Sequence, residues 1–284
     1  MCVGAPVDLD LDTWVSIRRP RVYILMVRKD TTDAARLART AACMAESLER
    51  ERARDKPVLL SRFLIHPTSP DWLTHVSGFL SMASPPSAVP KPKRWKGERP
   101  MWETDSETMR EKWATLQQPG HSAQPLKGAA LQGVAAHQQA KVRTLGELVL
   151  INAAHIEEKH VEDAAAVEEL KSGLFMDITQ SWTFQNKGRK RDVRSLKCLV
   201  TGSRVYCFEA DRLVSPAELL RAHGWDFDGT AGMPPLNLVG ITNSQAHDLL
   251  GESMAVQSCS VALWSLLAAT GEAMKDVWPD AVQQ

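Results

Sequence analysis

One short apolar run, Val22 to Val27, constrains the fold of this chain more than any other feature. The run begins with a β-branched and an aromatic residue and is bounded by polar residues, which is typical of an interior strand in a parallel sheet. Three arginines, Arg18, Arg19 and Arg21, stand at its entrance. The simplest interpretation is a solvated strand end, whose arginines extend their charged groups into water.

Length and composition set the outer limits of the interpretation. A chain of 284 residues buries about three quarters of its unfolded surface, so one large domain or two modest domains are both possible. The 34 basic and 34 acidic residues balance, so any nucleic-acid site must be local. Five cysteines without a close pair favour a reduced intracellular compartment. Since no signal segment and no apolar run near ~20 residues is present, we expect a soluble protein.

The pattern of residues predicts ordered segments around a less regular middle. Alanine and leucine at helical spacing predict a helix that ends near Arg54. The segment from Ser81 to Pro100 carries five prolines and five cations, which predicts an exposed, extended loop. Further helices are predicted over Ser106 to Gln117 and Leu145 to Leu170, and strand-like pieces begin at Phe175.

The last quarter of the chain has clear helix signals. Ser215 followed by Pro216 is a strong helix start, and Gly224 fits the end of that helix. A short helix is predicted to break at Gly251, and an apolar helix should follow from about Met254 to Ala269. We expect this helix to pack beside the strand at Val22 to Val27, in one domain with it.

Three motifs, in order along the chain, resemble those of one enzyme family. The segment "SIRRPRVYILMVR" is similar to a motif of the C5-type DNA cytosine methyltransferases, Gln-x-Arg-x-Arg-Val-Tyr-Ile. The segment "RLVSPAELLRAHGWD" resembles the family's Arg-x-Leu-(Ser/Thr)-Pro-x-Glu helix, and "LLGESMAVQ" resembles its closing Gly-Asn-Ser-Val motif. The matched positions are Arg19, Arg21, Val22, Tyr23, Ile24, Arg212, Leu213, Pro216, Glu218, Gly251 and Ser253.

Two departures limit the resemblance. Ile17 stands where the family has glutamine, and Glu252 stands where it has asparagine. The family's Pro-Cys nucleophile motif and its Gly-rich cofactor loop have no counterpart in the sequence. The resemblance therefore implies the carboxy-terminal half of such an enzyme, as a truncated gene product, a split protein or a degenerate descendant, and inactive alone.

The resemblance also implies a fold and its division into domains. The fold would be α/β, a partial S-adenosylmethionine-dependent, Rossmann-like methyltransferase sheet domain with an inserted, irregular α+β target-recognition region. Residues 1–55 would end the catalytic sheet domain. Residues 56–205, which include the Pro-rich basic loop at 81–100, would form a region like the family's target-recognition region. Residues 206–284 would return to the catalytic domain.

In this family, attack on cytosine pushes negative charge toward O2 and N3, which a guanidinium at a strand end can stabilise. Arg21 is the candidate for the O2 contact, and Arg19 would orient the flipped nucleotide or its phosphate. Gly251 and Ser253 would lie at a helix start and line the edge of an S-adenosyl-L-methionine pocket. That pocket would have one wall only, so we expect no measurable cofactor binding by this chain alone.

A basic segment between strand-like pieces is the candidate DNA contact. Within a recognition region it could grip DNA phosphates, although a nuclear-localisation patch or a solvated loop explains it equally well. A nuclear location is one expectation from it. Its cations are Lys187, Arg189, Lys190, Arg191, Arg194 and Lys197.

Other candidate sites are weaker. Trp95, Trp102 and Trp113 could stack on bases, but packing explains them better. His155 and His160 do not share a helix face, which argues against a metal site. Two functional classes remain, a methyltransferase portion that needs its missing half and a non-catalytic nucleic-acid-binding or protein-interaction module on the same scaffold.

Overall fold

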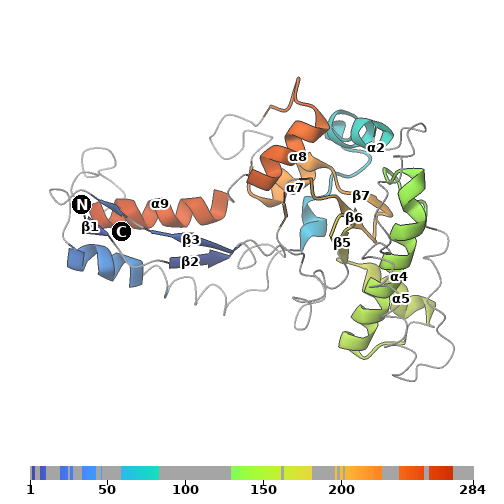
Figure 1. Cartoon of the computed structure of the whole chain (residues 1–284), viewed down its shortest axis with the longest axis horizontal. Coiled ribbons are helices and arrows are strands. Elements are labelled where there is room, and N and C mark those ends of the chain that lie inside the picture. The colour runs from blue at the N-terminus through green and yellow to red at the C-terminus, as the bar shows by residue number, and fades with distance from the viewer. Residues whose placement is uncertain are drawn as a thin grey trace, which may run out of the picture. The chain divides into compact units, whose positions relative to one another are not determined.

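The computed structural model describes residues 2–3, 7–10, 20–24, 26–27, 34–42, 46, 59–82, 129–160, 163–180, 196, 199–200, 202–225, 237–252 and 256–270 (Figure 1). The predicted helix over 106–117 and nearly all of the predicted loop over 81–100 lie outside these residues. The chain divides into two compact units. Unit 1 comprises residues 1–58, 222–236 and 253–284, and unit 2 comprises residues 59–221 and 237–252.

Short antiparallel strand pairs form the β structure of unit 1. Strand β1 (Cys2–Val3) pairs with β4 (Met26–Val27), and β2 (Val7–Asp10) pairs with β3 (Pro20–Tyr23). A helix over residues 34–42 and the helix α9 (Val256–Thr270) complete the described part of this unit.

The prediction of one interior strand in a parallel sheet was wrong. The apolar run is divided between β3 and β4, and Ile24 and Met26 are 51% and 57% exposed. The physical reason lies in "VDLD" of β2, whose strict alternation suits an antiparallel strand with one solvated face. The expectation that the run and the apolar helix share a domain is confirmed, because β3, β4 and α9 belong to unit 1.

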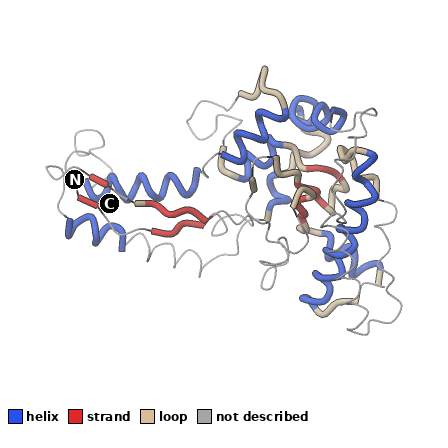
Figure 2. The backbone as a smooth tube through the Cα atoms, in the orientation of Figure 1, coloured by secondary structure: helices blue, strands red, loops and turns tan. Residues whose placement is uncertain are grey.

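Unit 2 is built around a small antiparallel sheet and a long helix. The sheet has the order β5 (Phe175–Asp177), β6 (Val205–Cys207), β7 (Arg212–Leu213), and its three strands (red in Figure 2) are buried. Helices α4 (Ala136–Glu157) and α5 (Ala164–Lys171) lie beside one another (Figure 1) and share one hydrophobic core with the sheet. The fold is therefore mixed helix and strand.

The remaining elements of unit 2 are short. They are the 3-10 helix η2 (Leu60–Phe63), the π-helical η3 (Trp72–Ser77), and the α-helices α2 (Gly78–Met82), α7 (Pro216–Ala222) and α8 (Asn243–Glu252). Helix α7 begins at the proline after Ser215, as predicted. Gly224, two residues past its end, has the left-handed φ of 84° expected for a helix stop.

The predicted helix from Leu145 to Leu170 is in fact interrupted. Helix α4 ends at Glu157, and Glu158 takes a left-handed φ of 55°. The N–H of Lys159 donates to the carbonyl of Ala154 at 2.9 Å, which closes the helix end. Asp163 then caps α5 by accepting from the N–H of Ala165 at 2.9 Å. Local capping therefore overrides the continuous helical pattern.

A left-handed residue, Asp211, joins the sheet to the segment before α4. Its φ is 48°, and one carboxylate oxygen accepts from the N–H of Leu131 at 3.0 Å and from the hydroxyl of Tyr206 at 2.6 Å. Burial, with the neighbouring Asp211, raises the pKa of the Tyr206 phenol. The phenol therefore stays a donor, and the turn between β6 and β7 is fixed.

Candidate functional site

Two buried polar sites stand out in unit 2, and the first is an ion pair. Arg212 on β7 is 4% exposed and Glu218 on α7 is 0% exposed. The guanidinium donates Nη2 to Glu218 Oε1 at 2.7 Å and Nη1 to Oε2 at 2.9 Å. The fork of two parallel bonds is the strongest geometry that arginine offers a carboxylate.

Backbone groups complete the coordination of the Glu218 carboxylate. It accepts from the N–H of Ser215 at 2.8 Å and from the N–H of Ile65 at 2.7 Å. The Ser215 hydroxyl accepts in turn from the N–H of Glu218, so Ser215 and Glu218 form a reciprocal capping box at the start of α7. The guanidinium also stacks over the ring of Trp72, 5.0 Å from its centroid. We call Arg212, Ser215 and Glu218 the ion-pair cluster, and its hydrogen bonds are provided by protein groups.

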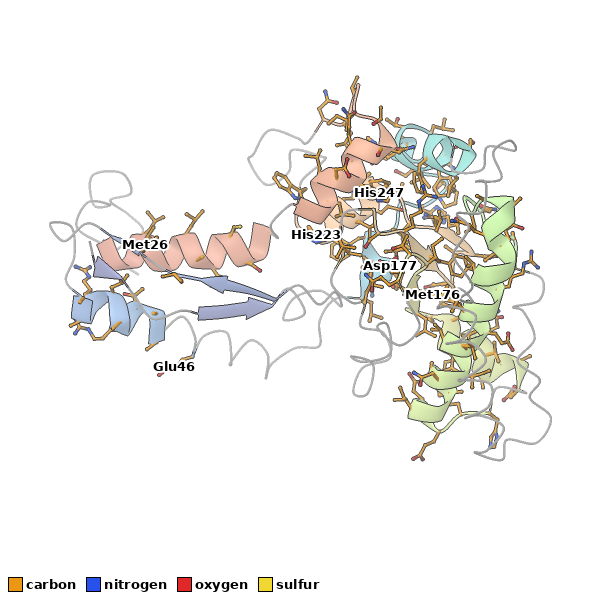
Figure 3. All side chains as sticks on the ribbon, viewed as in Figure 1. Met26, Glu46, Met176, Asp177, His223 and His247 are labelled. Atoms are coloured by element: carbon orange, nitrogen blue, oxygen red, sulfur yellow. The ribbon has the colours of Figure 1, made fainter. Side chains whose placement is uncertain are left out.

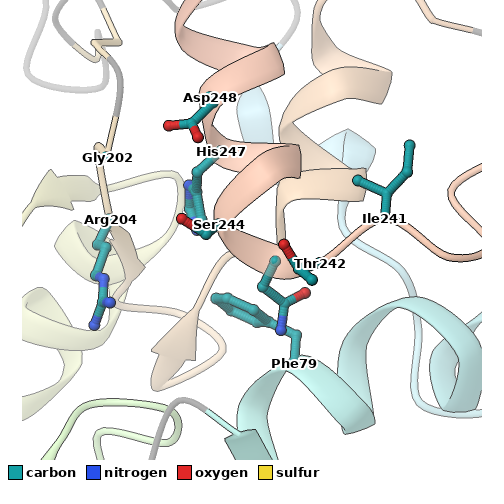
Figure 4. A pocket seen from close by; sticks show the side chains of 9 residues that line it. Phe79, Gly202, Arg204, Ile241, Thr242, Ser244, His247 and Asp248 are labelled. Carbon is teal, nitrogen blue, oxygen red and sulfur yellow. The ribbon is translucent and has the colours of Figure 1, made fainter.

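The second site is a pocket of about 440 Å³. One wall is the first turns of α8, and the opposite wall is the turn before β6, which carries Arg204 (Figure 4). Phe79 of α2 and Ile241 add apolar surface. All of its lining residues belong to unit 2. We call it the His247 pocket after its most buried polar side chain.

The His247 side chain lies in the pocket wall (Figures 3 and 4). It is 8% exposed, and neither ring nitrogen has a hydrogen-bond partner in the described structure. Its closest ring contact is Phe79, at 6.0 Å between centroids. Burial above all, and then the charge of Arg204, lower the pKa of His247 to about 4, against the opposing effect of Asp248. The imidazole is therefore neutral at pH 7 and offers one donor and one acceptor.

The start of α8 presents backbone donors to the same pocket. Thr242 and Gln245 form a capping box, in which the Thr242 hydroxyl accepts from the N–H of Gln245 at 3.3 Å and Gln245 Oε1 accepts from the N–H of Thr242 at 2.9 Å. The N–H groups of Asn243 and Ser244, in the first turn, have no acceptor within the helix. Both residues line the pocket.

Arg21 and Gly251, the sequence-predicted site residues that the structure describes, are not among the residues of the ion-pair cluster or the lining of the His247 pocket. Arg21 lies on β3, paired with Leu9 of β2. Gly251 lies in the last turn of α8, where carbonyl groups and not N–H groups lack helical partners, so the predicted helix start at this residue was wrong. Arg19, Ser253 and the basic segment, Lys187, Arg189, Lys190, Arg191, Arg194 and Lys197, lie outside the described residues.

Sequence reasoning missed the His247 pocket. One signal was present, because His247 sits on the same helix face as the buried Ala246 and Leu250, and a histidine at such a position needs an explanation. No sequence pattern indicated Arg204, because only the tertiary fold brings it close to α8. In the ion-pair cluster, the sequence located the helix start at Ser215 and Pro216 but not the buried pairing of Arg212 with Glu218, and Leu213 stands one residue before the leucine position of the family motif.

No protein-family model and no curated protein sequence matches the chain. Within the described ranges, His, Cys, Asp and Glu side chains do not gather in threes or more as a metal ion would require. None of the helices in those ranges is both long and apolar enough to cross a membrane.

Proposed function

We propose that the chain is the carboxy-terminal portion of a DNA cytosine-5 methyltransferase-like protein, which methylates cytosine in DNA with S-adenosyl-L-methionine as the methyl donor. The nucleophilic cysteine and the Gly-rich cofactor loop would come from chain outside this sequence. The finer fold that goes with this proposal is a Rossmann-like catalytic sheet domain with an inserted target-recognition region.

One observation carries the proposal. The matched positions of the second motif are all buried. Its arginine and glutamate, Arg212 and Glu218, form an ion pair with two hydrogen bonds, and Leu213 and Pro216 are buried beside them. Arginine and glutamate are rarely buried unless they are paired, so the burial of this pair indicates a structural use for the two charged positions of the motif. The shared unit of β3, β4 and α9 adds support, since the first motif contains β3 and β4 and the third motif, which begins in unit 2, runs into α9.

The proposed roles follow the resemblance. Arg21 would stabilise the charge that develops on the cytosine, with Arg19 beside it, and the basic segment over 187–197 would hold DNA phosphates. This segment is also the basis for proposing a nuclear location. The geometry at Gly251 does not fit a helix-start contact to S-adenosylmethionine, so we derive no step through the cofactor in this chain.

The test is complementation. The chain is fused behind an amino-terminal methyltransferase half that carries the cofactor loop and the Pro-Cys motif, and transfer of a radiolabelled methyl group to duplex DNA is measured. Arg21→Ala should lower turnover at least about a hundredfold and leave duplex affinity unchanged. Arg39→Ala, which removes an exposed arginine of the same unit, is the matched control and should change neither.

A salt titration tests the DNA contact separately. Replacing Arg189, Lys190 and Arg191 with alanine should weaken binding to all duplex sequences alike and reduce the salt dependence by about one unit per lost contact. If the fusion transfers no methyl group but the chain still binds duplex DNA, the non-catalytic nucleic-acid-binding alternative replaces the proposal. If the chain binds no duplex at low salt, both fail and a protein-interaction module remains.

A further inference from the structure

The His247 pocket contains polar groups whose partners the protein does not provide. Both ring nitrogens of His247 are buried and unpartnered in the described structure. A buried polar group without a hydrogen bond costs about 1–3 kcal/mol, so proteins rarely retain one without a use for it. Neither nitrogen is accessible to solvent, so a bound molecule can supply the missing bond once the side chains that cover the ring move aside.

The charges around the pocket indicate what kind of molecule that is. Arg204 faces α8 across the pocket (Figure 4), and no ion pair to its guanidinium is present among the described residues. The first turn of α8 adds the N–H groups of Asn243 and Ser244, which have no acceptor within the helix, and the positive end of the helix dipole. A guanidinium and helix N-terminal amides are the donors that bind phosphate in proteins.

The apolar part of the wall indicates the rest of the ligand. Phe79 and Ile241 line the pocket beside these donors, and its volume of about 440 Å³ exceeds what one phosphate ion fills. An organic phosphate, with its body against the apolar side, uses the whole space.

We propose that the His247 pocket is a binding site for an organic phosphate, whose phosphate oxygens accept from Arg204, from the N–H groups of Asn243 and Ser244 and from the ring N–H of His247. The site lies outside the three methyltransferase-like motifs, and it goes beyond the proposed function without resting on it. Asp248 is the only acidic residue among the lining residues, and its repulsion of an anion holds the affinity at a moderate level.

The experiment follows the ring signals of His247 by NMR in the full chain labelled at its eight histidines. Inorganic phosphate and phenyl phosphate are added at constant ionic strength, with sodium chloride as the reference. The His247→Gln variant identifies the signal by its loss. We expect saturable shifts of this signal, with a dissociation constant of about 1 mM for phosphate and about tenfold lower for phenyl phosphate.

Two variants that change the charge of the pocket in opposite directions make the test specific. Arg204→Ala, at an exposed position, should weaken phenyl phosphate binding about tenfold or more, and Asp248→Asn should tighten it severalfold. Arg62→Ala, which removes an exposed arginine of unit 2 away from the pocket, is the matched control and should have no effect.

The source of the phosphate is tested by adding duplex DNA. If the natural ligand is a small organic phosphate, duplex will not displace phenyl phosphate. If the natural ligand is a nucleic-acid backbone, duplex DNA will displace phenyl phosphate and Arg204→Ala will weaken duplex binding. Either result agrees with a phosphate site in this pocket. The proposal is overturned if neither probe shifts the His247 signal up to about 20 mM, if sodium chloride produces the same shifts, or if Arg62→Ala weakens binding as much as Arg204→Ala.

Discussion

The ion-pair cluster and the His247 pocket lie in the same unit and bury comparable polar groups, but they satisfy them differently. The Glu218 carboxylate receives two bonds from Arg212 and one each from the N–H groups of Ser215 and Ile65. The imidazole of His247 receives none from the described protein. Buried polar groups with complete partners fix a structure, whereas those without partners raise its free energy until something binds.

This difference assigns different roles to the two sites. The cluster ties β7 and the start of α7, which are close in sequence, to the segment at Ile65, which is 153 residues from Glu218, so it links distant parts of unit 2. We therefore expect changes in the cluster to lower stability and changes at the pocket rim to lower ligand affinity.

The largest expected effect is on stability, from Glu218→Gln. The substitution keeps the shape but leaves the Arg212 guanidinium buried without its counter-charge, which should cost about 3–5 kcal/mol. Urea unfolding measures the loss. Asp71→Asn, which removes one charge of the half-exposed pair with Arg221, is the control and should cost less than about 1 kcal/mol.

A double variant sharpens this prediction. Adding Arg212→Met to Glu218→Gln removes both charges together and keeps an amide oxygen that can accept from the backbone N–H groups, so neither charge remains buried alone. Much of the stability lost in Glu218→Gln should return. If the double variant is less stable than Glu218→Gln, the pair contributes more than mutual neutralisation and the explanation is wrong.

The burial of His247 should make the free energy of unfolding decrease as pH falls. The pKa of His247 is about 4 in the folded chain and 6.5 ordinarily, so the unfolded chain binds more protons between these values. Stability is therefore complete above pH 6.5 and declines by up to about 3 kcal/mol on acidification to pH 4. The groups that face the ring are Arg204, which stays charged, and Asp248.

The measurement compares urea unfolding at pH 7 and pH 4.5 for the wild type and for His247→Gln. Both proteins share every other titrating group, so the difference between their pH dependences isolates His247. The variant should lose less stability than the wild type on acidification. Equal losses would mean that the imidazole is not held in its neutral form by burial.

The smallest stability effects are expected from variants that remove the capping residue of α7 or of α8. Ser215→Ala should cost about 1–2 kcal/mol, because its hydroxyl caps α7 inside the buried cluster. Thr242→Ala removes the same kind of cap from α8 at an exposed position and should cost only about 0.5–1 kcal/mol. Thermal unfolding of both variants checks the order, and a reversed order contradicts the distinction between the sites.

The sequence predicted those features that depend on neighbouring residues. The Ser-Pro-x-Glu pattern located the start of α7, because a capping box is a local structure. It did not show that Arg212 completes the site, since the pairing requires β7 to lie against α7. The strand "VDLD" was not predicted, and its partner β3 was assigned to a parallel sheet because the pattern of one strand does not specify its neighbour.

The His247 pocket could not be predicted for the same reason. Arg204 precedes β6 and His247 lies on α8, and no spacing rule relates two residues so far apart in the chain. The arrangement follows from the packing of unit 2 as a whole. The functional residues that the resemblance suggested, Arg19, Arg21 and the basic segment, remain predictions for the experiments above.

The central distinction, between a site that stabilises and a site that binds, is tested most directly by one comparison. Unfolding free energies are measured with and without phenyl phosphate, at constant ionic strength, for the wild type, Glu218→Gln and Arg204→Ala, with Ser215→Ala as a milder change in the cluster. A ligand at ten times its dissociation constant should stabilise the wild type by about 1.4 kcal/mol. The cluster variants should start less stable but keep this increment, whereas Arg204→Ala should start as stable as the wild type and lose it. If Arg204→Ala retains the increment, or if Ser215→Ala abolishes it, the two sites do not have separate roles.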